Sequence, residues 1–532
     1  MSVMMALVTL ALVSLHSGQA DQEGDDTTLR EIAQTCQMTH QAIQSLLAAT
    51  GQNQTPPPTN YALPICLQGQ LSDRTQKGEK GDGGEIGRVG KAGPQGLKGA
   101  KGDNGDVGIQ GRKGEKGDTG PTGAKGNQGI CKEPTPGIPH PDFQSSWLNL
   151  HSQAGASSFM TVHHNLGELP VRVKVLVRAL GGPNDGYMFE GVGATSADDD
   201  YAATRYGGVI FSYNETEVRI WAPDVRNNEE IGCIISTGGP LWGGKYDQCT
   251  HSAEVKVQAW LPLTFPCPDI VTGWFEFKSE DGMNSFKEVE HNLGERPSLV
   301  VVQYKAVDAG PDFEDFVHEG FGAAQCDDDR EWADYGGLVY ATDSWSVRLW
   351  APSKHDSSYE DANYGGSIIN VKDGWGGETF SLQKHVASVK ISIWKRHIPE
   401  PDFQTDWFMQ MGQGSGINPF REIRLPSVIQ PDLVQVEVQA LDGPNQGFIF
   451  YGMGVQQAHP GTNYGGVAFG YSNSTIRLWS PSSSSGAIVN VIDGWGGEVN
   501  VQSSKVAMVT VKVWQTYGNY NHGSCTTSTI NT

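Results

Sequence analysis

Alternating apolar and polar positions recur through the C-terminal two thirds of the chain and predict short β-strands. The clearest runs are residues 170–177, 254–260 and 509–514, in which apolar and polar side chains alternate. A period of two places every second side chain on one face of a sheet, where it can be buried. Turns rich in Gly, Pro and Asn separate these runs, and no long amphipathic helix accompanies them. The pattern therefore predicts an all-β, sandwich-like fold.

The strand-rich region contains three copies of one sequence pattern. A Tyr-Gly-Gly step and an Arg-X-Trp step each recur at intervals of 129 residues, the first at Tyr206, Tyr335 and Tyr464. A copy of this length is large enough to bury a core of its own. We therefore expect three tandem β-sandwich repeats, over residues 141–262, 268–397 and 401–517, and a flexible tail over 518–532.

A different period occurs near the N-terminus. Between residues 27 and 50, apolar or small side chains follow alternating steps of three and four, as in the seam of a coiled coil. The positions are Leu29, Ile32, Cys36, Thr39, Ile43 and Leu46. We expect residues 21–77 to form a short coiled-coil trimerisation segment followed by a linker. A surface helix without a partner is the alternative.

Residues 78–131 have a period of three. Glycine begins eighteen consecutive triplets, which contain only two prolines, Pro94 and Pro121, both at the X position. A glycine at every third position is required where three polyproline-II chains meet at a common axis, because no side chain fits there. The glycines are Gly78, Gly81, Gly84, Gly87, Gly90, Gly93, Gly96, Gly99, Gly102, Gly105, Gly108, Gly111, Gly114, Gly117, Gly120, Gly123, Gly126 and Gly129.

This triplet series resembles the collagen triple-helix repeat, which implies a homotrimer with a rod roughly 160 Å long. A short collagen rod followed by repeated C-terminal domains is similar in layout to collectins and ficolins. The strand pattern of the C-terminal repeats, with its terminal aromatic strand, is similar to that of H-type lectin modules. It matches neither C-type lectin, fibrinogen-like nor globular complement-type heads, and no ligand residue is carried over from these families.

Composition and the N-terminal segment indicate the compartment. Residues 1–20 contain an apolar core followed by small residues, which is typical of a secretory signal peptide. The net charge of -22 provides no dominant basic surface, so nucleic acid is not an expected partner. Later segments lack the roughly 20 apolar residues of a membrane helix. We expect a secreted extracellular protein that does not insert into membranes.

The cysteines and glycosylation sequons agree with export. Cys233 and Cys249 flank the Trp-Gly-Gly loop of the first repeat, and the other two repeats lack both cysteines, which favours an intrachain disulfide. The cysteines on either side of the collagen-like tract, Cys36, Cys66 and Cys131, are candidates for bonds between chains, and pairing within one chain is the alternative. Asn-X-Ser/Thr sequons predict N-glycosylation at Asn53, Asn214 and Asn473.

Recurring aromatic and arginine positions are the candidate ligand contacts. Each Arg-X-Trp step places arginine and tryptophan on the same strand face, where indole could stack on a sugar ring. The pairs are Arg219 with Trp221, Arg348 with Trp350, and Arg477 with Trp479. The tryptophans of the Trp-Gly-Gly loops, Trp242, Trp375 and Trp495, are further candidates. The alternative is a structural role, because a fold that occurs three times needs the same residues each time.

Two acidic runs at matching positions are a candidate calcium site. They comprise Asp198, Asp199 and Asp200 in the first repeat and Asp327, Asp328 and Asp329 in the second. Clustered carboxylates favour a hard cation such as calcium, although the spacing matches no standard calcium loop. A solvated acidic loop is the alternative.

The sequence favours a binding protein over an enzyme, because no recurring catalytic residues were identified. Repeated heads on a trimeric stalk predict a multivalent recognition protein for repeated surface ligands such as glycans. A structural matrix or coat component is the alternative.

Overall fold

The chain divides into two compact units, Met1–Thr122 and Gly123–Thr532. The computed structural model describes residues 137–152, 156–194, 206–224, 232–239, 241–279, 282–323, 335–353, 366–371, 375–377, 380–412, 419–454, 464–491, 494–517, 527–530 and 532, all in the second unit. These residues are almost entirely β-strand, turn and short 3₁₀ helix, which confirms the all-β class for this part of the chain. Among them, no helix has the length and apolar character needed to cross a bilayer.

The strands recur in the same order in the three repeats. The first repeat and the segment before it contain β1 (Ile138–Pro139), β2 (Phe143–Gln144), β3 (Leu148–His151), η1 (Ala156–Ser158), β4 (Phe159–His163), β5 (Arg172–Ala179), β6 (Met188–Glu190), β7 (Tyr206–Gly207), β8 (Ile210–Tyr213), β9 (Glu217–Trp221), β10 (Gly232–Cys233), β11 (Ile235–Thr237), β12 (Gln248–Thr250) and β13 (Ser252–Trp260). The second contains β14 (Ile270–Thr272), β15 (Phe275–Lys278), η2 (Gly282–Ser285), β16 (Phe286–Glu290), β17 (Leu299–Ala306), β18 (Val317–Glu319), β19 (Val339–Thr342), β20 (Ser346–Trp350), β21 (Ile369–Val371), β22 (Leu382–Lys384) and β23 (Val386–Trp394). The third repeat and the tail contain β24 (Phe403–Gln404), β25 (Phe408–Met411), β26 (Phe420–Arg424), β27 (Leu433–Ala440), β28 (Ile449–Tyr451), β29 (Tyr464–Gly465), β30 (Ala468–Tyr471), β31 (Thr475–Trp479), β32 (Gly486–Ala487), β33 (Val489–Val491), η4 (Gly496–Glu498), β34 (Gln502–Ser504), β35 (Val506–Trp514), β36 (Thr516–Tyr517) and β37 (Ser528–Ile530).

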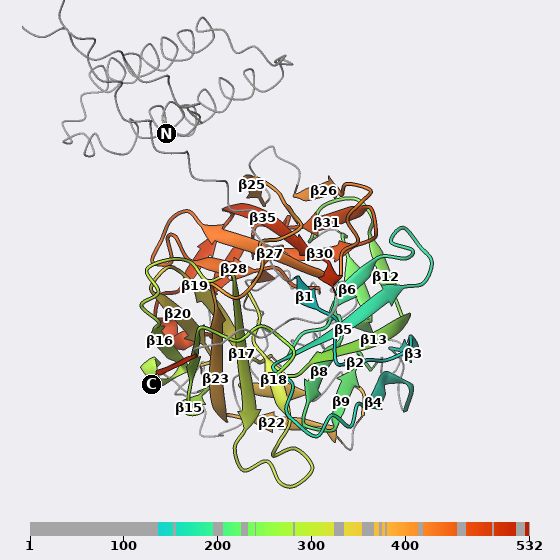
Figure 1. The fold of residues 1–532 in the computed structure, drawn as a ribbon. Helices are drawn as coiled ribbons and strands as arrows, with labels where there is room; N and C mark the ends of the chain where they lie inside the picture. The colour runs from blue at the N-terminus through green and yellow to red at the C-terminus, as the bar shows by residue number, and fades with distance from the viewer. Residues whose placement is uncertain are drawn as a thin grey trace, which may run out of the picture. The chain divides into compact units, whose positions relative to one another are not determined.

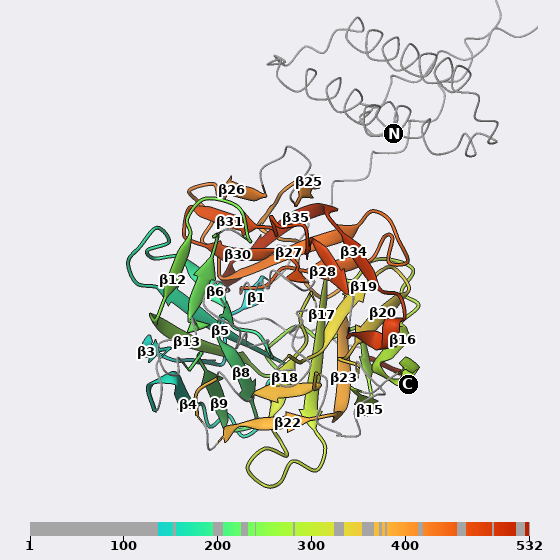
Figure 2. The same ribbon diagram turned by 180° about the vertical axis from the view of Figure 1, so that it is seen from behind.

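Each large sheet is shared by two repeats. Strands β2, β13, β5 and β6 of the first repeat continue into β30, β31 and β26 of the third. The second sheet joins β14, β23, β17 and β18 of the second repeat to β8, β9 and β4 of the first. The third joins β16, β20 and β19 of the second repeat to β28, β27, β35 and β24 of the third. The three repeats therefore form a closed ring, and they follow one another around a common centre in both views (Figures 1 and 2).

Apolar side chains of two facing sheets form the core within a repeat. In the first repeat, Val175 of β5 and Val257 of β13 pack in one cluster with Phe211 of β8 and Ile220 of β9. The alternation predicted from the sequence thus correctly identifies one buried face. The opposite face of β5 is buried too: Lys174 is 3% exposed, and Leu176 belongs to a cluster formed mainly by residues of the third repeat.

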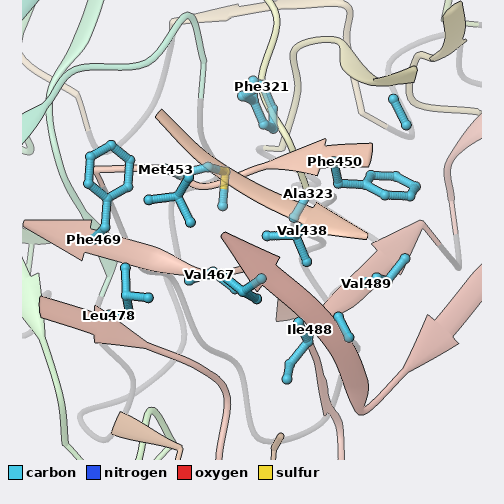
Figure 3. Close-up of a cluster of buried hydrophobic side chains, with 14 of the residues drawn as sticks. Phe321, Ala323, Val438, Phe450, Met453, Val467, Phe469, Leu478, Ile488 and Val489 are labelled. Atoms are coloured by element: carbon cyan, nitrogen blue, oxygen red, sulfur yellow. The ribbon is translucent and has the colours of Figure 1, made fainter. Parts of the chain in front are cut away.

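The cores of adjacent repeats are continuous. Phe321 and Ala323 of the second repeat belong to the same cluster as Val438, Met453 and Ile488 of the third (Figure 3). The hydrophobic contacts between repeats are thus part of the core, and the repeats do not fold around three separate cores.

The two ends of the repeat series also meet. Strand β1, which precedes the first repeat, pairs in parallel with β36, which follows the third, with Ile138 opposite Thr516. The terminal tryptophans of the long strands bind the segments that precede each repeat: Nε1 of Trp260, Trp394 and Trp514 donates to the carbonyl oxygens of Pro139, Pro266 and Pro399 at 2.8, 2.6 and 2.8 Å, respectively.

The tail differs from its prediction. Residues 518–532 were expected to be flexible, but Ser528–Ile530 forms β37, which adds to the edge of the second repeat by pairing in parallel with β14. Thr527 also donates from Oγ1 to the carbonyl oxygen of Pro268 at 2.8 Å.

Three glycines allow adjacent repeats to approach closely. A Cβ added at Gly193, Gly322 or Gly454 would lie 1.9, 1.8 or 2.1 Å from a backbone carbonyl oxygen of the next repeat. Those oxygens belong to Glu319, Tyr451 and Glu190. Since backbone atoms cannot move aside as a flexible side chain can, the ring closes only if these positions have no side chain.

We predict that Gly322→Ala lowers the free energy of unfolding by about 1–3 kcal/mol or more, since this is the usual range for overpacking a core. Thermal or chemical denaturation of the protein measures this change. Gly273→Ala is the matched control, because a Cβ at that position meets nothing within 4 Å. Equal stability of the two variants would contradict the close approach between repeats.

Candidate functional site

The arginines of the Arg-X-Trp steps lie between repeats. Arg219 on β9 donates from Nη1 to the carbonyl oxygen of Asp312 in the second repeat at 2.6 Å. Its guanidinium carbon lies 3.8 Å from the ring centroid of Phe316 and 4.5 Å from that of Phe380, both also in the second repeat. Glu217 accepts from Nε at 3.1 Å. The arginine therefore joins two repeats by a hydrogen bond and by cation–π contacts.

The other two arginines repeat this arrangement around the ring. Arg348 donates to the carbonyl oxygen of Pro444 in the third repeat at 2.8 Å and lies 3.9 Å from the Phe448 ring. Arg477 donates to the carbonyl oxygen of Pro183 in the first repeat at 2.9 Å and lies 4.0 Å from the Tyr187 ring. Each repeat thus holds the next one by the same contact.

The tryptophans of the Arg-X-Trp steps are buried at the same interfaces. Trp221, Trp350 and Trp479 are each at most 1% exposed. Nε1 of Trp350 donates to the carbonyl oxygen of Val499 in the third repeat at 3.0 Å, and Nε1 of Trp479 donates to that of Lys245 in the first at 3.0 Å.

The Trp-Gly-Gly tryptophans pack on the Tyr-Gly-Gly tyrosines of the preceding repeat. The ring centroids of Trp375 and Tyr206 lie 5.8 Å apart, and those of Trp495 and Tyr335 also lie 5.8 Å apart. In the third pair, the ring centroids of Trp242 and Tyr464 lie 5.7 Å apart. All three tryptophans are buried.

These positions support the structural alternative for the recurring Arg and Trp residues. An indole that is almost fully buried cannot stack on a ligand at the surface, and the guanidinium groups already contact the neighbouring repeat. The residues concerned are Arg219, Trp221, Arg348, Trp350, Arg477, Trp479, Trp242, Trp375 and Trp495, and we do not propose them as ligand contacts. The sequence could not reveal that each has its partner in another repeat.

Polar side chains lie where the three repeats meet. Lys174 forms an ion pair with Glu190, and Glu319 accepts a hydrogen bond from the Tyr213 hydroxyl at 3.0 Å. Burial lowers the pKa of Lys174 and raises that of Glu319. His318 is fully enclosed here and donates from Nδ1 to the carbonyl oxygen of Gly193 in the first repeat at 2.8 Å. Its burial lowers the pKa of His318 to about 4.

A cavity of about 200 Å³ opens between the second and third repeats. Trp407, Glu437, Lys512 and Trp514 of the third repeat line it, together with Thr342 of the second. Lys512 contacts Glu437 with 2.5 Å between Nζ and Oε1, and Gln435 donates from Nε2 to the same oxygen at 2.7 Å. Arg296 and Lys395 of the second repeat also line the cavity. It combines an apolar wall with a few fixed polar groups, as small-molecule sites do.

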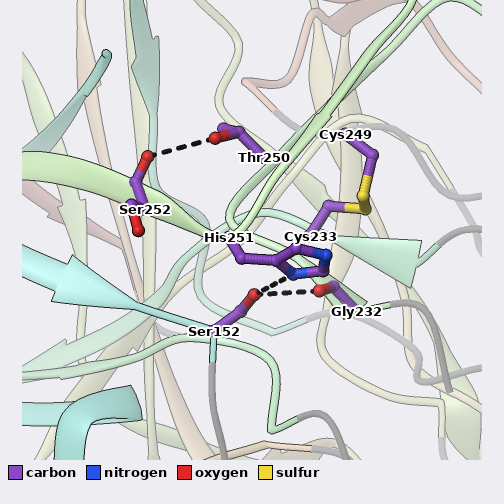
Figure 4. The surroundings of a disulfide bond; sticks show 7 residues. All are labelled: Ser152, Gly232, Cys233, Cys249, Thr250, His251 and Ser252. Atoms are coloured by element: carbon purple, nitrogen blue, oxygen red, sulfur yellow. Dashed lines mark hydrogen bonds between the residues drawn. A yellow bond between two sulfur atoms is a disulfide. The ribbon is translucent and has the colours of Figure 1, made fainter. Parts of the chain in front are cut away.

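Serine–histidine pairs that no sequence pattern indicated occur in two repeats. Ser152 lies 2.6 Å from His251 Nδ1, and Ser279 lies 3.0 Å from His385 Nδ1. Both serines are buried, and Ser152 donates its own proton to the Gly232 carbonyl oxygen at 2.9 Å (Figure 4). A hydroxyl engaged in this way is not an exposed nucleophile, so the pairs stabilise strand pairing and do not suggest hydrolysis.

The predicted disulfide between Cys233 and Cys249 is present, with 5.3 Å between the Cα atoms (Figure 4). It links β10 to β12 within the first repeat. Cys267 is also in a disulfide, and its partner lies outside the described residues.

The sequons differ in their surroundings. Asn473 is exposed in the turn between β30 and β31. Asn214 is half-buried in the corresponding turn between β8 and β9, where its Oδ1 accepts from the backbone amides of Thr216 and Glu217 at 2.8 and 2.9 Å. Whether either is glycosylated stays a prediction.

Several predicted sites lie outside the described residues. They are the collagen-like tract from Gly78 to Gly129, the interchain cysteine candidates Cys36, Cys66 and Cys131, the sequon at Asn53, and the acidic runs Asp198, Asp199, Asp200, Asp327, Asp328 and Asp329. The part of the chain that the structure describes contains no cluster of three metal-binding side chains.

Comparison with known proteins identifies one region. Residues 74–134 match the family model described as the collagen triple helix repeat. No curated protein matches the chain, and no solved structure matches it. The collagen-like tract is thus identified as such, and the C-terminal repeats are not assigned to a family.

We predict that Arg477→Met lowers the free energy of unfolding by about 2 kcal/mol or more, because a charge-assisted hydrogen bond and a desolvated cation–π contact between repeats are lost. Lys278→Met is the control: Lys278 is paired with Glu276, but both side chains are well exposed. Loss of this exposed ion pair should lower the free energy of unfolding by at most about 1 kcal/mol. Denaturation curves compare the variants, and a harmless Arg477→Met would contradict the proposed structural role.

We predict that His318 makes the ring less stable as the pH falls from about 6.5 toward 4. The unfolded chain binds a proton near the ordinary pKa of 6.5, whereas the folded chain does not until about pH 4. The slope can reach about 1.4 kcal/mol per pH unit. Glu319, whose pKa is raised, acts in the opposite sense, because a folded carboxyl with a raised pKa gains relative stability on acidification.

Comparing the protein with its His318→Gln variant isolates the histidine, since Glu319 is present in both. Unfolding free energies measured between pH 7.5 and 4 should fall more steeply for the unsubstituted protein. Parallel curves would show that His318 is not held neutral.

Proposed function

We propose that this chain forms a secreted homotrimer in which a collagen-like stalk carries multivalent binding heads for repeated surface ligands such as glycans. A signal peptide, an N-terminal coiled coil and interchain disulfides near the stalk belong to this proposal. So does the interpretation of the repeats as three joined β-sandwiches. A collagen triple helix requires three chains, so each stalk would present three copies of the C-terminal unit.

The observation that carries the proposal is the closed ring. Three separate repeats on each chain would give nine domains per trimer, but shared sheets and a common core favour one head per chain. Three rigid heads on one stalk can bind a repetitive surface simultaneously, and weak sites then gain affinity from a high effective concentration. The cavity between the second and third repeats gives each head one candidate binding site.

A structural matrix or coat component is the alternative. It would use the stalk and the interchain disulfides for assembly, with the rings serving as spacers. Solubility distinguishes the two, because a matrix component would be recovered mainly as an insoluble, crosslinked product.

We predict that the secreted protein is a soluble trimer that binds glycan arrays or microbial surfaces. Heads released from the stalk by collagenase should bind the same surfaces at least about 100-fold more weakly, because they lose multivalency and retain their contacts. Sedimentation and surface binding, with and without collagenase, measure both properties. Equal binding before and after cleavage, or absence of binding to any surface, would contradict the proposal.

A further inference from the structure

One side chain on the wall of the cavity between the second and third repeats is much smaller than its equivalents. Thr342 ends β19, and the corresponding residues are Tyr213 at the end of β8 and Tyr471 at the end of β30. All three occupy the same register position, opposite Ile449, Val317 and Met188, respectively.

The two tyrosines fill the corresponding space at the other interfaces. Both are 0% exposed. The hydroxyl of Tyr213 binds Glu319 at 3.0 Å, and that of Tyr471 lies 3.5 Å from Glu190. Thr342 is shorter by a phenol ring, and its hydroxyl donates to the backbone carbonyl oxygen of Ser346 at 3.1 Å. The missing phenol ring leaves space beside Thr342, and Tyr451, which ends β28 where β18 and β6 end in Glu319 and Glu190, lines the same cavity.

The indole on the wall of this cavity also differs from its equivalents. Trp147 in the first repeat is covered by Arg178 and Lys256, which lie 4.2 and 4.6 Å from the ring centroid. Trp274 in the second repeat has Lys305 and Lys390 at 5.5 and 5.9 Å.

In the third repeat the positions of both cations are occupied by neutral residues. Strand register places Gln439 of β27 and Thr510 of β35 where the first repeat has Arg178 and Lys256. Within the described residues, no cation lies over the ring of Trp407, which lines the cavity instead. An aromatic face without a cation is available to a ligand.

Polar groups specific to the third repeat complete the wall. The positions equivalent to Glu437 and Lys512 are Leu176 and Gln258 in the first repeat, and Gln303 and Ser392 in the second. Glu437 is 5% exposed, and its contacts with Gln435 and Lys512 both involve Oε1. Its other oxygen, Oε2, is therefore a possible acceptor for a ligand hydroxyl, and Lys512 is a donor.

We propose that this cavity binds one terminal pyranose ring of a glycan, with an apolar ring face on Trp407 and hydroxyls bonded to Glu437 and Lys512. The volume corresponds to roughly seven water molecules, which suits one sugar ring better than a larger ligand. The three differences described above occur together at this interface, whereas the other two interfaces are filled or covered. The inference deepens the proposed function and rests on it.

The decisive variant is Thr342→Tyr, which introduces the residue found at the other two interfaces and so places a phenol ring in the cavity. In the full-length trimer, we expect it to reduce binding of methyl pyranosides, neutral or carboxylated, at least tenfold without lowering the melting temperature. Ligand-detected nuclear magnetic resonance and a glycan array measure the binding.

Trp407→Ala is the second variant and should also weaken binding about tenfold. Trp147→Ala is its matched control, because this tryptophan occupies the same position in the first repeat under its two cations, and it should leave binding unchanged. Together the variants keep the proposal testable if Thr342→Tyr proves difficult to fold.

The outcomes separate this inference from the proposed function. If the trimer binds glycan or microbial surfaces but Thr342→Tyr and Trp407→Ala bind equally well, the cavity is not the site and the proposed function stands. Surface binding that no pyranoside competes for leads to the same conclusion. If the unsubstituted trimer binds neither pyranosides nor surfaces, both proposals fail.

Discussion

The structure depends on completing the sheet edges of one repeat with strands from the next. The short strands β6, β18 and β28 each have a neighbour in their own repeat on one side and in another repeat on the other. A strand edge left open exposes unpaired backbone groups and invites aggregation. Three such edges can be satisfied at once only if the repeats close into a ring, and the pairing of β1 with β36 joins its two ends.

This constraint explains what the recurring sequence motifs do. Because every interface uses the same edges, every repeat needs the same contacts across them, and arginine, tryptophan and glycine therefore recur at fixed intervals. The recurrence was visible in the sequence, and it favoured a structural role. The partner of Arg219 was not visible, because Phe316 and Phe380 belong to another copy of the pattern and no periodicity links them to it.

Strand alternation predicted the β class and the inner face of β5, where Val175 and Val177 are buried. The alternation does not reveal that the opposite face is buried as well, because a lysine at an alternating position normally indicates solvent. Lys174 instead faces the centre of the ring and pairs with Glu190. The two residues lie on the neighbouring strands β5 and β6 of the first repeat, and their burial depends on the tertiary arrangement of the repeats, which local periodicity does not encode.

The candidate binding site depends on departures from the repeat. Aligning the three copies places Thr342 beside Tyr213 and Tyr471, so this difference was present in the sequence from the start. The effect of this difference on the interface could be recognised only from the structure, because only the ring shows that the tyrosines fill an interface. Recurring residues therefore maintain the ring, while a residue that breaks the pattern makes room for a ligand at one of three otherwise similar positions.

Calorimetry of the C-terminal unit, after collagenase has removed the stalk, tests the closed ring most directly. Shared sheets and a continuous core predict one cooperative transition, with a van't Hoff enthalpy equal to the calorimetric enthalpy. Three independent domains would instead give separate transitions, or one broad transition whose van't Hoff enthalpy is about a third of the calorimetric value. That result would contradict the ring.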